Sequence, residues 1–309
     1  MRVLSLAGTE HLDLRGHTLV LPGAGGLAFL GELTTDAIVS TFGLRRVAVV
    51  LSRHILPMAS ASAWEASAAD GEGAARPAGL TFGAELYQHE KRPGLSVLQL
   101  RASVVQGRRR TVAEELWQWV REKGVAELIL VGSCSAHVKV DSDLAAATQL
   151  RYITVGAATP MAPGGGVLPV LPLGGPAEKA AEAATVAAAL EAEARGEEAP
   201  EPVPRVQAGG VEAAESLLRG GGLASPFVFL ASGVGGNAGF EDSRSGAGPD
   251  ALFLLGLTGE GIDWTLTEKL AKVTCLCVAS QLKMEEAPAF KPPPSWQFEA
   301  DALPRPPWE

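Results

Sequence analysis

The sequence has 309 residues, of which 47% are hydrophobic and 20% charged, and its formal net charge is −9. These values are typical of a globular protein with one large domain or two modest ones. The negative charge argues against nucleic acid or an anionic membrane as a partner, because both require a basic surface. No apolar run is long enough to span a membrane, and the N-terminus lacks a signal-peptide core. Three cysteines are too few for a disulfide framework, which predicts a reducing compartment, cytosol or nucleus.

The first elements predicted are a strand, a helix and a second strand. Residues 17–22 form a short apolar run that predicts a buried strand. After a glycine-rich turn, apolar residues at helical spacing predict a helix over 27–41, which ends at Gly43. Residues 45–52 predict a second buried strand, whose nearly continuous β-branched residues are typical of parallel strands.

A loop, a hairpin, a helix and a strand follow. Small residues over 59–79 predict a loop, and alternation over 82–103 predicts a hairpin with its turn at 92–94. Residues 111–123 predict an amphipathic helix that ends at Gly124, with Thr111 as a candidate N-cap. Its core face comprises Val112, Leu116, Trp119 and Val120. Residues 125–133 predict a further buried strand.

The composition changes after residue 155. Residues 156–204 are rich in Ala, Gly, Pro and Glu and lack aromatic residues, which predicts a flexible insertion. Beyond it, the pattern predicts a helix near 209–219, a strand over 225–232 and a glycine-rich loop over 233–248. It then predicts a helix that begins near Asp250 and another over 265–273, followed by a proline-rich end that is not regular.

This order predicts an α/β fold with a mixed, mostly parallel sheet flanked by helices. A single domain would comprise 1–155 and 205–290, interrupted by the 156–204 insertion. Residues 291–309 would form a proline-rich C-terminal tail.

One enzymatic alternative lies in the glycine turn. Residues Gly23–Ala28 fit G-x-G-x-x-A after a strand and before a helix, as in dinucleotide-binding proteins. In those proteins an acidic residue at the end of the second strand binds the ribose, whereas here that strand ends at Ser52, Arg53 and His54. A lone motif of this kind is weak, and a plain strand-to-helix turn is the favoured interpretation.

A second alternative is nucleophilic catalysis by Cys134, which follows a buried strand as nucleophiles do in strand-to-helix turns. His137, Asp141 and Asp143 lie close by in sequence, but catalytic triads usually draw on separate loops. A polar loop is therefore favoured over an active site. Cys275 and Cys277 lie in an apolar run that predicts core packing. The sequence predicts no metal site and no cofactor.

Tryptophans indicate two further candidate sites for binding a partner protein. On an amphipathic helix, Trp117 and Trp119 cannot both face the core, so one is either partly buried or part of a partner surface. The tail contains Trp296 and ends in Pro307, Trp308 and Glu309. Such an end can enter a pocket of a partner, with the indole buried and the carboxylate bound, or be a frayed terminus.

The order of several blocks resembles the proteasome assembly chaperone 2 family. The blocks are "HTLVLPGAGGLAFLGELTTDAIVSTFGLRRVAVVLSRHILPMA", "ELYQHEKRPGLSVLQLRASVVQGRRRTVAEELWQWVREKG", "LILVGSCSAHVKVDSDL" and "LRYIT", and later "RVQAGGVEAAESLL", "PDALFLLGLTGEGIDW" and "PPPSWQF…LPRPPWE". The resemblance covers roughly 17–155 well and 205–309 more loosely, and it does not extend to 156–204.

The resemblance implies a chaperone and not an enzyme, in the cytoplasm and nucleus, on a fold similar to phosphorylase/hydrolase-like α/β domains. It implies a heterodimer with proteasome assembly chaperone 1. This dimer binds the proteasome α-ring, promotes assembly of the 20S core particle and blocks off-pathway association. In related chaperones a C-terminal hydrophobic–Tyr–any motif enters pockets between α-subunits. Pro307, Trp308 and Glu309 occupy that place here, with an indole in place of the phenol.

Overall fold

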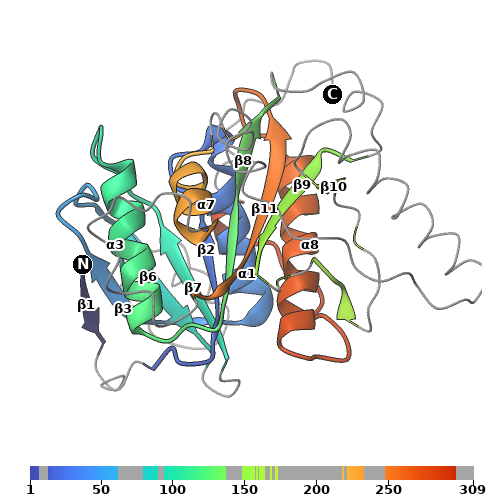
Figure 1. The fold of residues 1–309 in the computed structure, drawn as a ribbon, viewed down its shortest axis with the longest axis horizontal. Coiled ribbons are helices and arrows are strands. Elements are labelled where there is room, and N and C mark those ends of the chain that lie inside the picture. Colours follow the sequence, from blue (N-terminus) through green and yellow to red (C-terminus); the bar gives the residue numbers. More distant parts are fainter. Residues whose placement is uncertain are drawn as a thin grey trace, which may run out of the picture.

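A nine-stranded sheet dominates the part of the chain that the computed structural model describes (Figure 1). The strands lie in the order β1-β3-β6-β7-β2-β8-β11-β9-β10. The structure describes residues 1–6, 13–61, 79–89, 94–136, 148–156, 158, 160–163, 168, 171–172, 218, 221–232 and 248–296.

The strands of this sheet are β1 (Arg2–Ser5), β2 (Thr18–Pro22), β3 (Arg45–Leu51), β6 (Ala84–Gln88), β7 (Leu95–Leu100), β8 (Glu127–Ser135), β9 (Leu150–Val155), β10 (Leu171–Pro172) and β11 (Asp250–Thr258). A separate antiparallel pair comprises β4 (Ala59–Ala61) and β5 (Leu80–Phe82). The helices are the 3-10 turn η1 (Leu27–Phe29), α1 (Leu30–Phe42), α3 (Arg109–Glu122), α7 (Ala224–Ser232) and α8 (Trp264–Gln281).

The sheet is mixed, as predicted, and its centre is parallel. Strands β7, β2, β8 and β11 pair in parallel, and so do β9 and β10 at one edge. The pairs β1–β3, β3–β6, β6–β7 and β9–β11 are antiparallel. The predicted hairpin over 82–103 is therefore confirmed as β6 and β7. Parallel pairing is concentrated at the sites where helical connections return the chain to the centre of the sheet.

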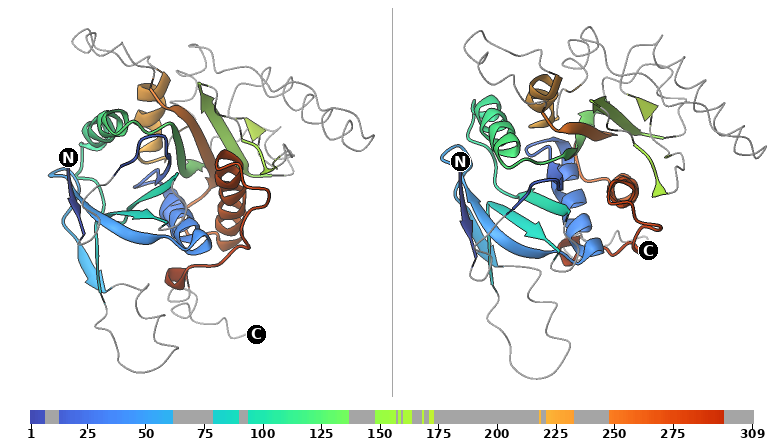
Figure 2. Two further views of the ribbon diagram at one scale, coloured as in Figure 1. Left: turned by 90° about the horizontal axis from the view of Figure 1, so that it is seen from below. Right: turned by 60° about the horizontal axis from the view of Figure 1, so that its bottom comes forward.

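Helices cover both faces of the sheet, with α1 and α8 on one face and α3 and α7 on the other (Figure 2). Neighbouring residues along a strand point to opposite faces. On β8, Leu128 and Leu130 thus join the hydrophobic cluster beneath α3 and α7, whereas Ile129 and Val131 join the cluster beneath α1 and α8. Because both faces are covered, the central strands are buried throughout and contain continuous apolar runs.

The helix predictions before residue 124 are largely confirmed. Helix α1 ends at Gly43, whose φ of +61° is the left-handed conformation that glycine adopts without a steric cost. All four residues of the expected core face of α3 are buried. Its N-cap is Arg108 and not Thr111, and no side chain caps this end. The helix therefore begins two residues earlier than the sequence indicated.

Two predictions in the second half of the chain are wrong. Residues 225–232, expected as a strand, belong to helix α7, and the helix expected from Asp250 is strand β11. Both segments are short, continuous apolar runs, in which periodicity does not distinguish a buried helix from a buried strand. The Ala and Leu residues of β11 favour a helix intrinsically, but the strand lies between β8 and β9, where tertiary pairing decides.

Strand β3 also differs from the parallel arrangement that its composition indicated. Its neighbours on both sides, β1 and β6, are antiparallel to it. Two strands, β6 and β7, separate it from β2. Continuous apolar composition reflects burial and not strand direction, which explains the difference.

The range predicted as an insertion, 156–204, contributes a few described residues. Leu168 and Ala158 are buried in the cluster beneath α1 and α8, and β10 pairs with β9 at the sheet edge. The remainder of the insertion, the helix expected near 209–219 except Leu218, and the loop over 233–247 lie outside the described residues. The separation into a domain and an insertion stays a prediction.

Candidate functional site

The glycine turn after β2 is held by backbone hydrogen bonds. The Gly23 N–H donates to the Val131 carbonyl at 2.6 Å, and the Gly26 N–H donates to the Gly23 carbonyl at 3.1 Å. Gly25 has a φ of +73°, and further along the turn Ala28 and Phe29 have φ values of +57° and +51°. Two successive non-glycine residues in the left-handed region are unusual, and they reverse the chain into α1.

The chain itself fills the place that a phosphate would take at this turn. The Glu32 carboxylate accepts from the Gly25 N–H at 3.0 Å, so an acid of the first turn of α1 occupies the anion position. The backbone at Gly222 also packs on the turn, since a Cβ there would lie 2.3 Å from the Ala24 carbonyl oxygen. Because β3 is remote from β2, the second strand of a dinucleotide-binding unit is also missing from this position. The geometry disfavours the nucleotide alternative.

Burial raises the pKa of Glu32 to about 7, with a smaller contribution from the nearby Asp36 carboxylate. The Gly25 hydrogen bond opposes this shift without cancelling it. The Glu32 Oε2 atom is buried and has no hydrogen-bond partner among the described residues. This carboxyl group therefore titrates near neutral pH. Its hydrogen bond with Gly25 gives it a structural place in the turn.

Cys134 lies at the end of β8 and is fully buried, with 0% of its surface exposed. Burial raises the pKa of its thiol to about 12, although the charge of Arg151 acts in the opposite direction. A reactive cysteine needs an accessible, stabilised thiolate, and this environment provides neither. The structure thus disfavours the nucleophile alternative. His137, Asp141 and Asp143 lie outside the described residues.

Cys275 and Cys277 are buried in helix α8, which confirms the predicted core packing. Their apolar run is part of this helix. Within the described ranges, no three His, Cys, Asp or Glu side chains are arranged to bind a metal ion. No helix in the same part of the chain is long and apolar enough to cross a membrane.

The Trp117 and Trp119 pair packs within the molecule. Trp119 is buried in the core beneath α3. Trp117 packs edge-on against Phe227 of α7, with 6.4 Å between the ring centroids, and also lies against Gly248. The structure thus confirms partial burial as the interpretation of this pair.

A buried ion pair connects α1 with the sheet and with the C-terminal segment. The Arg101 guanidinium donates to both carboxylate oxygens of Asp36, at 2.8 and 2.7 Å. Gln99 and Ser295 also donate to this carboxylate, at 2.7 and 3.0 Å. Burial lowers the pKa of Arg101, but the charge of Asp36, the hydrogen bonds to it and the nearby Tyr87 together outweigh burial and raise this pKa. The sequence analysis missed this pair because its members lie 65 residues apart and form no motif.

A second buried carboxylate continues this network on β6. Glu85 is 0% exposed and accepts from Thr81 at 2.7 Å and from Tyr87 at 2.8 Å. Arg46 of β3 pairs with its other oxygen, and Arg101 lies 3.8 Å away. Burial, together with the Glu85 charge, raises the pKa of the Tyr87 hydroxyl. Side chains alternate between the two faces of β6, and this alternation directs the Glu85 side chain into the interior. No local sequence pattern indicates that Glu85 is buried.

The C-terminal segment folds back over α1 and α8. The Lys291 N–H donates to the Thr41 hydroxyl at 3.1 Å, and Ser295 binds Asp36 as described above. The Trp296 ring lies 5.6 Å from Trp264 and 6.0 Å from Phe290, measured between centroids. The described chain thus ends in an anchored aromatic residue. The predicted site residues Pro307, Trp308 and Glu309 lie outside the described residues.

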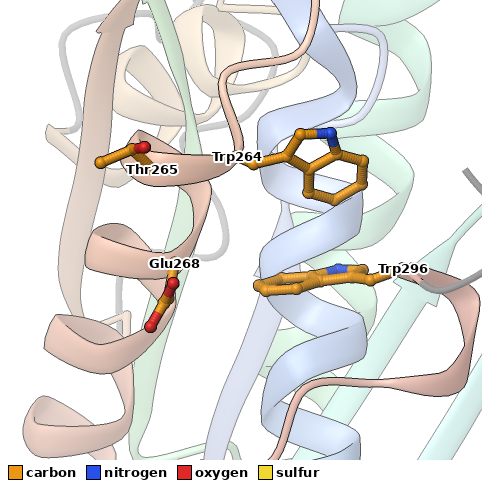
Figure 3. Close-up of a pocket in the computed structure, with 4 residues that line it drawn as sticks. All are labelled: Trp264, Thr265, Glu268 and Trp296. Carbon is orange, nitrogen blue, oxygen red and sulfur yellow. The ribbon is translucent and has the colours of Figure 1, made fainter. Parts of the chain in front are cut away.

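A pocket of about 280 Å³ opens beside this anchor, lined by Trp264, Thr265, Glu268 and Trp296. The two indoles lie one above the other, and Thr265 and Glu268, which follow Trp264 on α8, lie to their left in Figure 3. Glu268 also forms an ion pair with Lys272 at 2.6 Å. Aromatic faces beside a carboxylate form a surface suited to a cationic or proline-containing segment.

Comparison with known proteins establishes the family. The model of the PAC2 family matches residues 21–222, which is more than half of the chain, and the protein therefore belongs to the PAC2 family. The match extends from β2 through α1, β3, the hairpin, α3 and β8 to Gly222, which packs on the glycine turn.

Several curated relatives are named proteasome assembly chaperone 2. The protein from Danio rerio is 30% identical over 141 residues, which are 46% of this chain and 51% of that protein. The human protein is 29% identical over 146 residues, or 47% and 52%, and that of Nematostella vectensis is 31% identical over 147 residues, or 46% and 56%. The chain spans about half the length of the curated relatives it matches.

A solved structure shares the fold. Pyrococcus furiosus PbaA, described as an archaeal homolog of proteasome-assembly chaperone, superposes with a TM-score of 0.50. The alignment covers 95% of this chain and 91% of PbaA, at 12% sequence identity. This likeness supports the mixed α/β fold.

Proposed function

We propose that this protein is a proteasome assembly chaperone subunit that acts through protein contacts and not through catalysis. The membership of the PAC2 family carries this proposal, together with relatives named for proteasome assembly. The arrangement of the two enzymatic candidates is consistent with it. The glycine turn is filled by the chain's own carboxylate, and Cys134 is buried with a raised pKa.

Its proposed partners are a related chaperone subunit, proteasome assembly chaperone 1, and the α-subunits of the proteasome. In this proposal the heterodimer binds the α-ring, promotes assembly of the 20S core particle and blocks off-pathway association, in the cytoplasm and nucleus. Neither nucleic acid nor a membrane is a proposed partner, in keeping with the net charge of −9.

Affinity purification from the native organism, followed by mass spectrometry, tests this function. We expect the tagged chain to recover a second chaperone chain and α-subunits. Recovery of neither would contradict the proposal.

The C-terminal residues Pro307, Trp308 and Glu309 are the proposed contact with an α-ring pocket. The anchored Trp296 fixes the start of the tail, which leaves 13 residues to reach a partner. A buried aromatic anchor often contributes 2 kcal/mol or more, so deleting the three residues should weaken α-subunit binding by at least about tenfold. Binding of the partner chaperone should not change.

A matched control deletes Glu299, Ala300 and Asp301, which shortens the tail equally but keeps its end. The two deletions are compared by quantitative mass spectrometry of the purified complexes. Equal recovery of α-subunits from both variants would show that the terminal residues make no specific contact.

A further inference from the structure

The pocket beside Trp296 combines two features that recognise different parts of one ligand. The indoles of Trp264 and Trp296, with centroids 5.6 Å apart and planes inclined by 57°, form an apolar corner. Glu268 of α8 also lines this pocket (Figure 3). A volume of about 280 Å³ suits one or two side chains, since pockets for small-molecule ligands are typically larger, roughly 300–1,000 Å³.

One polar group of the pocket has a position open to a ligand. Lys272 lies 2.6 Å from one oxygen of Glu268, which leaves the other oxygen able to bind a second cation. A ligand that places a cation at Glu268 would therefore pair with this carboxylate beside two aromatic side chains.

The molecule already contains one contact between a cation and an aromatic ring next to the pocket. The Lys272 ammonium lies 5.5 Å from the centre of the Phe290 ring, and Glu268 holds it there. Indoles attract cations more strongly than phenyl rings do. The Trp264 and Trp296 faces are therefore at least as well suited to a cation as Phe290.

The sequence of the tail contains a segment with the matching chemistry. Residues 304–307 read Pro-Arg-Pro-Pro, and they follow Trp296, the last described residue, by eight positions. Proline-rich segments adopt an extended helix with exposed carbonyls and dock on aromatic grooves with little loss of entropy. Eight residues span up to about 26–29 Å, which is enough to return to a pocket beside their own starting point.

We propose that the pocket lined by Trp264, Glu268 and Trp296 binds the chain's own Pro304–Pro307 segment. The prolines pack on the indoles, and Arg305 pairs with Glu268. This contact holds the C-terminal end against α8 in the free protein. The docking itself depends only on the pocket and the tail. Its consequence, competition with the α-ring for Pro307–Glu309, rests on the proposed function.

Titration of a labelled peptide, residues 303–309, into full-length chains tests the docking. Fluorescence anisotropy reports its binding. The host for this titration is the full-length Arg305→Ala variant. Its own tail should dock weakly, so its pocket should be open to the peptide. The unaltered protein should bind it at least about tenfold more weakly, because its tethered tail competes at an effective concentration near the millimolar range.

Two further changes test the contact with Glu268. Glu268→Gln in the Arg305→Ala host should reduce peptide binding. A peptide that carries Arg305→Ala should bind weakly to either host, so that the two changes are not additive. Glu260→Gln is the matched control, because Glu260 is exposed on the same approach to α8 but does not line the pocket. It should leave binding unchanged.

Three outcomes would overturn the proposal. The Arg305→Ala host could fail to bind the peptide, Glu268→Gln could leave binding unchanged, or the unaltered protein could bind as tightly as the host. Concentration-dependent dimerisation of the unaltered protein, abolished by Arg305→Ala, would assign the pocket to the tail of a second copy and overturn docking within one chain. Because no α-subunit is present, failure here leaves the proposed chaperone function intact.

Discussion

At the residue scale, burial determines the protonation of one group in each enzymatic alternative, the Glu32 carboxyl at the glycine turn and the Cys134 thiol. Glu32 has a raised pKa because it is buried at the glycine turn, and Cys134 has a raised pKa because β8 places it in the core. In both cases the uncharged form is favoured. The environment of Cys134 therefore does not stabilise the thiolate that nucleophilic catalysis would require.

The Glu32→Gln variant should reveal this titration. The pKa of the carboxyl rises from 4.5 to about 7 on folding, so the folded state binds more protons between these pH values. Glu32 therefore destabilises the protein progressively as pH rises from about 4.5 to 7. Urea unfolding should show the Gln variant more stable than the parent by about 1–3 kcal/mol at pH 8, with little difference at pH 5.

The exposed Glu114→Gln variant is its control, and its effect should stay below about 0.5 kcal/mol at both pH values. An unchanged difference between the Glu32→Gln variant and the parent from pH 5 to pH 8 would contradict the shifted pKa.

Thiol alkylation should show that Cys134 is unreactive in the folded protein. At pH 8 its thiolate fraction is about 10⁻⁴, given a pKa of about 12, and the side chain is fully buried. Iodoacetamide should leave Cys134, Cys275 and Cys277 unmodified in native buffer and modify all three in urea, as measured by mass spectrometry. Rapid native labelling of Cys134 alone would restore the nucleophile alternative.

At the element scale, close backbone packing fixes the β2–α1 turn against the loop before α7. At Gly25 a Cβ would meet only the Arg109 side chain, at 3.7 Å, so the constraint there is a φ of +73° and not close packing. A steric constraint applies at Gly31 and Gly222, where a Cβ would lie 2.5 Å and 2.3 Å from backbone carbonyl oxygens.

Paired glycine substitutions can separate these effects. Gly222 and Gly107 both have positive φ values, +60° and +77°, but only Gly107 has open space at its Cβ position. Gly107→Ala should lower the free energy of unfolding by about 1 kcal/mol, the cost of the left-handed conformation. Gly222→Ala should lower it by more than about 3 kcal/mol, because the backbone must also move. Equal effects in urea unfolding would contradict the close packing.

Element prediction succeeded where a periodic pattern had clear boundaries. Helix α3 has a distinct apolar face and ends before Gly124, and the hairpin alternates on both sides of its turn. It failed for α7 and β11, whose short, continuous apolar runs show no clear period. Asp36, Arg101 and Glu85 escaped notice because isolated charges in a sequence do not indicate that folding buries and pairs them.

At the scale of the whole molecule, contacts between remote segments connect the C-terminus with the first helix. Ser295 and Asp36 are 259 residues apart and lie 3.0 Å from each other. The Asp36 carboxylate also binds Arg101 beyond the end of β7. The C-terminal segment is thereby fixed to α1 and the sheet, so its packing should contribute to global stability.

The Trp296→Ala variant should therefore lose about 2–4 kcal/mol of unfolding free energy, somewhat less than a fully buried tryptophan, because the ring is only partly covered. Trp296→Phe should recover part of this loss, since it retains the aromatic contact with Trp264 and Phe290. Urea unfolding measures both. Unchanged stability of the Ala variant would mean that the segment is not anchored.

The sequence alone determined the fold class, the order of most elements as far as β8, and a resemblance to proteasome assembly chaperone 2 that the PAC2 family match supports. These features depend on local patterns and on the order of blocks along the chain. Only the tertiary structure decided the strand order, the helical state of α7, the buried Asp36–Arg101 pair and the pocket at Trp296. Each of these depends on contacts between residues far apart in the chain, whose free energy local propensity does not encode.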